Sequence, residues 1–207
     1  MVEIDRFEIS LEEKEMIKMR LLFMIVYFKD RVIVREEYVD KMFSDYNEEF
    51  KEIEDCTNEV YGKALMVLNL IEIQYRLELT FLCLVCQMFE QFLIDIIVDR
   101  LKLDNGLYFV DVKFKFNEYG FDCENINSWK KIEELRLLVN VIKHADGKSR
   151  EKLQKIKPNY FYCDPKDMIK NTINDMKLNI ETKDFFSYCT AIIEFINKMP
   201  NRFEKEA

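Results

Sequence analysis

The sequence has few of the residues that interrupt regular secondary structure: 4 glycines and 3 prolines among 207 residues. A β-sandwich or barrel of short strands needs many such turn residues, so this scarcity argues against both. Apolar residues make up 49% of the chain and charged residues 34%. The composition therefore predicts a mostly helical protein, and the length fits a single domain with one large core.

The sequence also lacks a long apolar run and an apolar signal region. The runs "LLFMIVYF" and "FLCLVC" are far shorter than the ~20 residues needed to cross a bilayer, and the start, "MVEIDRFEIS", is acidic. We therefore expect a soluble, cytoplasmic protein that does not associate with a membrane.

In such a compartment, free buried thiols are the default state of cysteine. Cys83 and Cys86 have CxxC spacing, but they lie in an apolar helical segment with no second CxxC and no nearby histidine. We expect them to pack in the core and to bind no metal. The other cysteines are Cys56, Cys123, Cys163 and Cys189.

The formal net charge of -8 argues against a basic coat for general nucleic-acid binding. Residues 143–157 are an exception, with six basic residues against two acidic ones, a net of +4 that leaves -12 for the rest of the chain. Either this segment meets a phosphate-rich partner, or its charges are solvated or paired within the fold. The basic residues are Lys143, Lys148, Arg150, Lys152, Lys155 and Lys157.

Apolar spacing and capping residues predict helices along most of the chain. Ser10 and Glu13 form a capping-box signature that opens a helix ending near Lys29. Residues 59–102 are long enough for two helices or one kinked helix, and their apolar second half belongs at the centre of a bundle. The apolar positions of the first helix are Met16, Met19, Leu22, Phe23 and Val26.

The segment "VDVKFKF", residues 110–116, alternates apolar and polar residues, which predicts a strand paired with 160–162 or 178–180. Ser128 is the expected cap of a helix over 129–144, which Gly147 is expected to end, and Ser149 is the expected cap of a helix over 149–157. Further helices are predicted over 35–54 and 165–177, and from Thr182 onward. We therefore expect an all-α helical bundle with a long central helix and a small accessory β-sheet, organised as a single domain, 1–207, with N-terminal helices in 10–55, the central helix in 58–103 and the remaining helices in 128–200.

The stretch "ELRLLVNVIKHADGKS", residues 134–149, contains the single histidine of the chain, and places Arg136, Asn140 and His144 four residues apart. A helix stacks such positions on one face, here opposite an apolar stripe. The column is either the solvated face of an amphipathic helix or a site facing another helix or subunit. Asn140 favours the second interpretation, because Asn is a poor residue for a helix interior. The "GKS" at 147–149 is no P-loop, since Ile142 stands where that motif needs glycine.

This stretch, which follows a long apolar helix carrying "FEQFL", resembles the HEPN superfamily, helical domains of prokaryotic toxin and defence systems and of several RNA-cleaving proteins. The resemblance implies a homodimer that cleaves RNA without metal or other cofactor, at a cleft between subunits. It assigns proton transfer to His144, a phosphate clamp to Arg136 and an orienting hydrogen bond to Asn140. The family's arginine usually directly precedes the asparagine, a position held here by Val139. Lys143, Lys148 and Arg150 would guide the RNA, and Glu90 of "FEQFL" is the central-helix residue expected nearest the column.

Two functions stay open at this point. The first is a metal-independent endoribonuclease of a toxin–antitoxin or antiviral defence system, with RNA or a nucleotide as ligand. The second is a non-catalytic dimerising module, or a toxin-neutralising partner, that binds a protein of the same system. In the second case the polar column is a partner surface, and the basic turn docks on an acidic partner.

Overall fold

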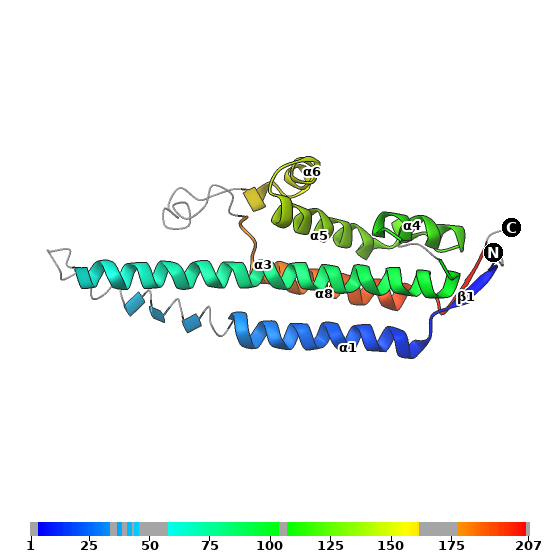
Figure 1. Ribbon diagram of the computed structural model, residues 1–207, viewed down its shortest axis with the longest axis horizontal. Coiled ribbons are helices and arrows are strands. Elements are labelled where there is room, and N and C mark those ends of the chain that lie inside the picture. Colours follow the sequence, from blue (N-terminus) through cyan, green and yellow to red (C-terminus); the bar gives the residue numbers. More distant parts are fainter. Residues whose placement is uncertain are drawn as a thin grey trace.

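The computed structural model describes residues 4–33, 37–38, 41–42, 44–45, 58–103, 107–161 and 178–205. Across these residues, six α-helices form an elongated bundle with a two-stranded sheet at one end (Figure 1). The predicted all-α bundle with a small sheet is confirmed. The helices are α1 (Leu11–Phe28), α3 (Asn58–Leu101), α4 (Phe109–Glu118), α5 (Asn127–His144), α6 (Lys148–Ile156) and α8 (Thr182–Lys198).

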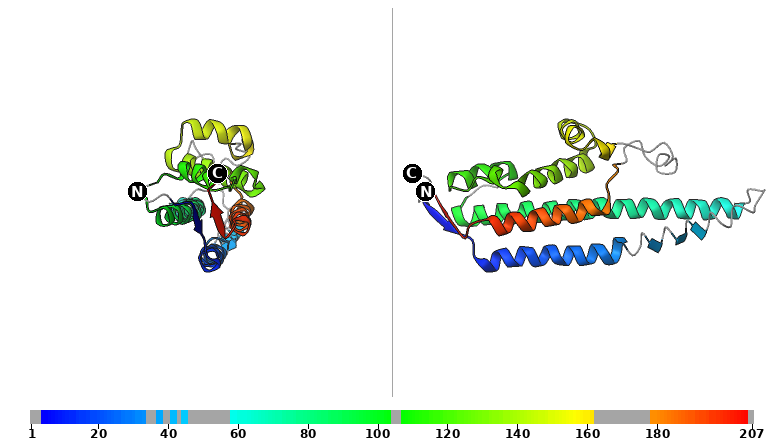
Figure 2. Two further views of the ribbon diagram at one scale, coloured as in Figure 1. Left: turned by 90° about the vertical axis from the view of Figure 1, so that its right-hand side faces the viewer. Right: turned by 180° about the vertical axis from the view of Figure 1, so that it is seen from behind.

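Helix α3 is the spine of the bundle and runs unbroken for 44 residues, so the long apolar segment is one helix. Helices α1, α5 and α8 lie along its C-terminal half (Figures 1 and 2), where Phe89, Leu93 and Ile97 are buried. Its stretch Asn69–Leu101 is apolar and long enough to cross a membrane, and 44% of its most apolar window is buried within the protein. Core helices of soluble proteins share these properties.

Helix α1 begins with the predicted capping box: the Glu13 amide donates to Ser10 Oγ at 3.1 Å, and the Ser10 amide donates to Glu13 Oε2 at 2.8 Å. The apolar residues of α1 lie on two opposite faces. Ile17, Leu21 and Phe28 are buried, whereas the apolar positions named from the sequence are exposed. The exposed set is Met16, Met19, Leu22, Phe23 and Val26.

The predicted strand over 110–116 is wrong, because this segment belongs to helix α4. Phe109, Val112 and Phe116 are buried, with the spacing of one helix face, while Val110 and Phe114 are 58% and 60% exposed. The apolar–polar alternation of 110–116 therefore coincides with part of a helical pattern that begins at Phe109.

The sheet joins the two ends of the chain instead of the predicted segments. Strand β1 (Arg6–Glu8) pairs antiparallel with β2 (Arg202–Glu204), with Phe7 opposite Phe203. These two rings are buried and stacked, with centroids 4.6 Å apart. The predicted partner 160–162 was wrong in its described part, because 3-10 helix Pro158–Phe161 covers it, and 178–180 contains no strand.

Several helix ends differ from the predicted caps. Helix α5 begins at Asn127, so Ser128 lies inside its first turn and is buried. It ends at His144 as predicted, but Ala145 follows with positive φ, and Gly147 instead opens α6. Ser149 accordingly lies within α6.

Glu181, one residue before the predicted cap Thr182, caps α8. Most of the predicted helix 35–54 and all of 165–177 lie outside the described residues.

Candidate functional site

Helix α5 carries the predicted polar column. It is continuous from Asn127 to His144, so Arg136, Asn140 and His144 lie on one side of it, each about 40° from the last. Along the helix axis, the first and last of the three are about 12 Å apart. The two ends of the column consequently meet different surroundings.

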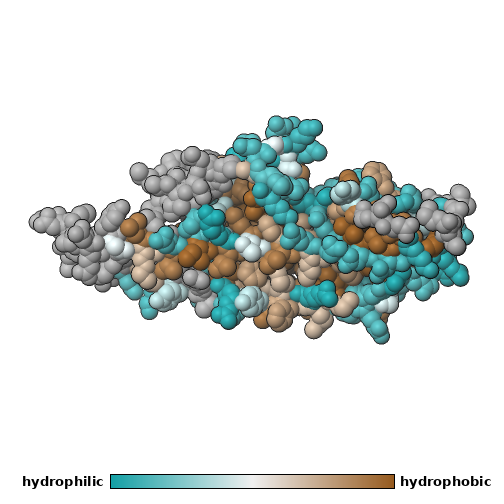
Figure 3. All heavy atoms as spheres, in the orientation of Figure 1, coloured by the Kyte–Doolittle hydropathy of each residue, from teal (hydrophilic) through white to brown (hydrophobic). Residues whose placement is uncertain are grey.

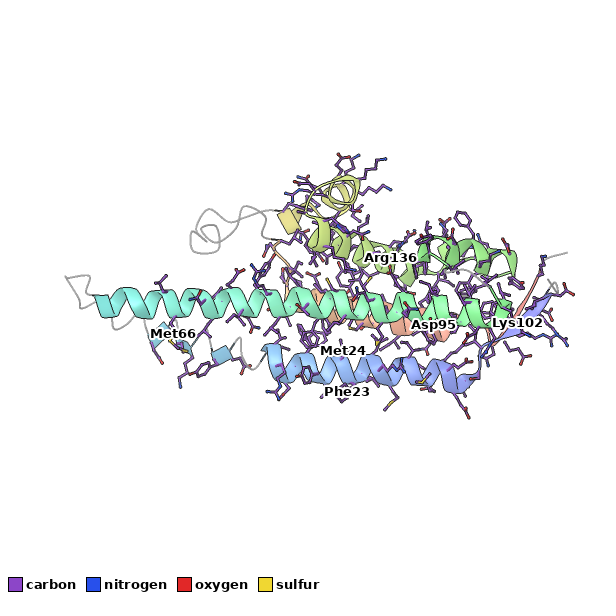
Figure 4. All side chains as sticks on the ribbon, in the orientation of Figure 1. Phe23, Met24, Met66, Asp95, Lys102 and Arg136 are labelled. Atoms are coloured by element: carbon purple, nitrogen blue, oxygen red, sulfur yellow. The ribbon has the colours of Figure 1, made fainter. Side chains whose placement is uncertain are left out.

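Arg136 faces the spine of the bundle. Its Nε donates to Glu90 Oε1 on α3 at 2.6 Å, and its guanidinium carbon lies 4.2 Å from the ring centroid of Phe109 on α4 (Figure 4). The side chains of Arg136 and Glu90 are only 28% and 26% exposed. Glu90 thus lies beside the column, as expected, but it neutralises the charge that the phosphate clamp requires. The sequence analysis did not single out Phe109.

His144 lies at the other end of the column and is exposed, while Asn140 is half-buried. The His144 carbonyl accepts a hydrogen bond from the Asp146 amide at 2.7 Å, and Ala145 between them has φ 59° and ψ -70°. This is a γ-turn with positive φ, a strained conformation for a residue with a side chain. The single histidine therefore stands beside a strained, solvent-facing turn.

The cysteines beneath the column are inert. Burial, together with the charge of Glu90, raises the pKa of the Cys86 thiol to about 12, while Arg136 and Lys143 oppose the shift. Burial likewise raises the pKa of Cys83. Both thiols are protonated at neutral pH and available neither as nucleophiles nor as ready metal ligands. Among the described residues, no group of three or more metal-binding side chains occurs.

The basic segment divides into paired and exposed residues. Arg150 Nε lies 3.7 Å from Asp146 Oδ1, and its guanidinium carbon lies 5.0 Å from the Phe161 ring centroid. Lys157 Nζ lies 3.5 Å from Glu134 Oε1. Pairing within the fold thus accounts for these two side chains. The exposed residues are Lys143, Lys148, Lys152 and Lys155.

Three of these exposed residues form a lysine stripe, which we define as Lys148, Lys152 and Lys155. Their spacing of four and three residues places them on one side of α6. The opposite side of this helix buries Leu153. Sequence analysis selected Arg150 for this surface, where the structure exposes Lys152 and Lys155 instead.

Sequence reasoning also missed a polar network behind α6. Tyr188 Oη donates to Glu134 Oε1 at 2.8 Å and lies 3.0 Å from Tyr160 Oη, and Lys131 Nζ donates to the same Glu134 oxygen at 2.6 Å. Burial raises the pKa of both tyrosines well above the usual range. The network joins Tyr160, which follows α6, to Tyr188 of α8 and through it to Glu134 of α5. One signal was available: on a helical wheel of α5, Glu134 falls within the buried arc, between Leu138 and Val141.

Comparison of the chain with protein-family models, curated proteins and solved structures finds no match. The resemblance to the HEPN superfamily remains a prediction that depends on the residues quoted above.

Proposed function

We propose that the chain is a HEPN-like helical domain of a prokaryotic defence or toxin system, and that it binds RNA at the turn between α5 and α6. The observation that carries this proposal is the lysine stripe, Lys148, Lys152 and Lys155, exposed on one side of α6. Lys143 and His144 are exposed at the adjoining end of α5.

The stripe suits a phosphate backbone. Its three ammonium groups are spread along about 10 Å of helix, and each can replace condensed counterions on a polyanion. The remainder of the chain carries a net charge of -12, the total of -8 less the +4 of residues 143–157. An RNA strand is repelled elsewhere, so this charge distribution orients its approach toward α6.

The Arg136–Glu90 pair favours RNA binding over RNA cleavage. A guanidinium already paired with a carboxylate contributes less charge to a second anion, and this one lies about 12 Å from His144 along α5. His144 is then the most exposed member of the column and lies nearest the proposed RNA surface.

A second candidate is metal-independent RNA cleavage, and the observation that favours it is the shared face of Arg136, Asn140 and His144 on an unbroken helix. An imidazole titrates near neutral pH and can transfer the proton of a ribose hydroxyl. The two candidates differ in whether bound RNA remains intact.

The test measures binding of a fluorescent single-stranded RNA by anisotropy, with the wild type and the triple variant Lys148→Gln, Lys152→Gln and Lys155→Gln. We expect the variant to bind at least tenfold more weakly. A matched control, Lys29→Gln with Lys130→Gln and Lys198→Gln, removes the same charge from exposed positions elsewhere and should bind almost as well as the wild type.

Equal losses in both triple variants, or no RNA binding by the wild type, would contradict the proposal. The same RNA, recovered after incubation and examined on a denaturing gel, separates the two candidates. Cleavage by the wild type that His144→Ala abolishes establishes the ribonuclease, whereas intact bound RNA supports the binding module.

A further inference from the structure

Helix α1 has an apolar face that no other part of the described structure covers. We call it the outer face and define it as Met16, Met19, Leu22, Phe23 and Val26, which are between 47% and 70% exposed. It lies on the side of α1 opposite Ile17, Leu21 and Phe28, which are buried against the bundle. Figure 4 shows Phe23 directed away from α3 and Met24 directed toward it.

The spacing on this face is that of a coiled-coil seam. Met16, Met19, Phe23 and Val26 follow one another at intervals of three, four and three residues, the a and d positions of a heptad. The outer face therefore has the pattern of a surface that packs against a second helix.

The exposed area is close to that of the smaller standard interfaces. Five apolar side chains exposed to this extent present a surface on the order of 500 Å², within the range of the largest patch on a monomer. Standard interfaces bury about 600–1,000 Å² on each partner. Apolar residues are also at the surface over the neighbouring part of α3 (Figure 3), where Leu65, Met66 and Ile73 are exposed.

We propose that a second copy of this chain packs on the outer face, with the two α1 helices related by a two-fold axis. A two-fold axis makes each contact occur twice, so the face is complementary to itself.

The dimer is independent of the proposed RNA surface. Helix α1 lies on one side of the bundle and α5 on the other, with α3 and α8 between them (Figures 1 and 2). Packing through α1 leaves both lysine stripes and both His144 side chains on outward surfaces. It is therefore a different association from a cleft shared between two α5 helices.

The test is the mass in solution, measured by light scattering on the full chain at micromolar concentration. We expect twice the chain mass of 25.1 kDa for the wild type and the single mass for Phe23→Glu. Phe114→Glu is the matched control, since this α4 side chain is 60% exposed against 70% for Phe23, and it should remain dimeric. His144→Ala should also remain dimeric, whether or not the RNA proposal holds.

A monomeric wild type would overturn the inference, as would a Phe23→Glu variant that stays dimeric. A monomer that floats with neutral phosphatidylcholine vesicles, and loses this property in Phe23→Glu, would assign the outer face to a membrane surface instead.

Discussion

Arg136 on α5 and Glu90 on α3 form an ion pair at 2.6 Å between Nε and Oε1, beneath the ring of Phe109. The pair connects the predicted polar column to the spine of the bundle. It turns the arginine of the motif into a structural residue and leaves His144 alone at the solvent-facing end.

The Glu90→Gln variant tests this assignment. It removes the carboxylate partner of a largely buried guanidinium, so we expect the free energy of unfolding to fall by about 1 kcal/mol in urea titrations. RNA affinity should rise severalfold, because the charge of Arg136 is no longer neutralised. The control Glu118→Gln alters an exposed pair with Lys115 and should change neither quantity. Unchanged stability in Glu90→Gln would show that the pair contributes nothing to the fold.

The Tyr188→Phe variant tests the network around Glu134. It removes the hydroxyl that donates to Glu134 and contacts Tyr160, both in a buried setting. We expect a loss of about 1–2 kcal/mol in the free energy of unfolding. Tyr108→Phe is the matched control, since that side chain is 76% exposed, and it should be neutral. Equal effects from the two changes would be inconsistent with the network.

The γ-turn after His144 predicts an unusual effect of glycine. Ala145 has φ 59°, which glycine adopts without strain. Relief of strain exceeds the added chain entropy, so Ala145→Gly should stabilise the protein by about 0.5–1 kcal/mol. Ala191→Gly, within α8, should destabilise it by about 1 kcal/mol. Thermal unfolding of the two variants should give shifts of opposite sign, and a loss of stability in Ala145→Gly would contradict the strained turn.

The buried thiols predict a loss of stability at high pH. Burial raises the pKa of Cys86 to about 12 from an ordinary value of 9.0. Above pH 9 the unfolded chain therefore loses a proton that the folded chain retains. The folded state is then disfavoured by up to about 1.4 kcal/mol per pH unit for this thiol.

The Cys86→Ala variant should show a shallower fall in unfolding free energy between pH 9 and 10.5, measured in urea under reducing conditions. Val85→Ala creates a comparable cavity beside it without removing a titrating group, and should keep the wild-type slope. Identical slopes in all three proteins would mean that Cys86 ionises freely in the fold.

Local patterns predicted most helices because capping and apolar spacing act within a few residues. The Ser10–Glu13 box and the unbroken apolar course of α3 are examples. The sequence also predicted that α5 ends at His144. It named Gly147 as the residue that ends the helix, whereas the residue with positive φ directly after the helix is Ala145. The observed N-caps lie two residues before Ser128 and one residue before Thr182.

The features that the sequence did not predict depend on tertiary contacts. In α1, both faces are apolar, so periodicity alone could not say which one meets α3. In α4, the alternation of 110–116 hid the buried set of Phe109, Val112 and Phe116. At the candidate site, the sequence predicted that Arg136, Asn140 and His144 lie on one face of a helix. The contact between Arg136 and Phe109 could not be predicted, because it depends on how α4 lies relative to α5.

The salt dependence of RNA affinity tests the central proposal most directly. Each lysine of the stripe that contacts a phosphate adds about 0.7 to the slope of log affinity against log salt concentration for a single strand. We predict that replacing Lys148, Lys152 and Lys155 with glutamine lowers the magnitude of this slope by about 2, while replacing Lys29, Lys130 and Lys198 leaves it almost unchanged. Identical slopes for the wild type and the stripe variant would show that RNA does not bind at α6.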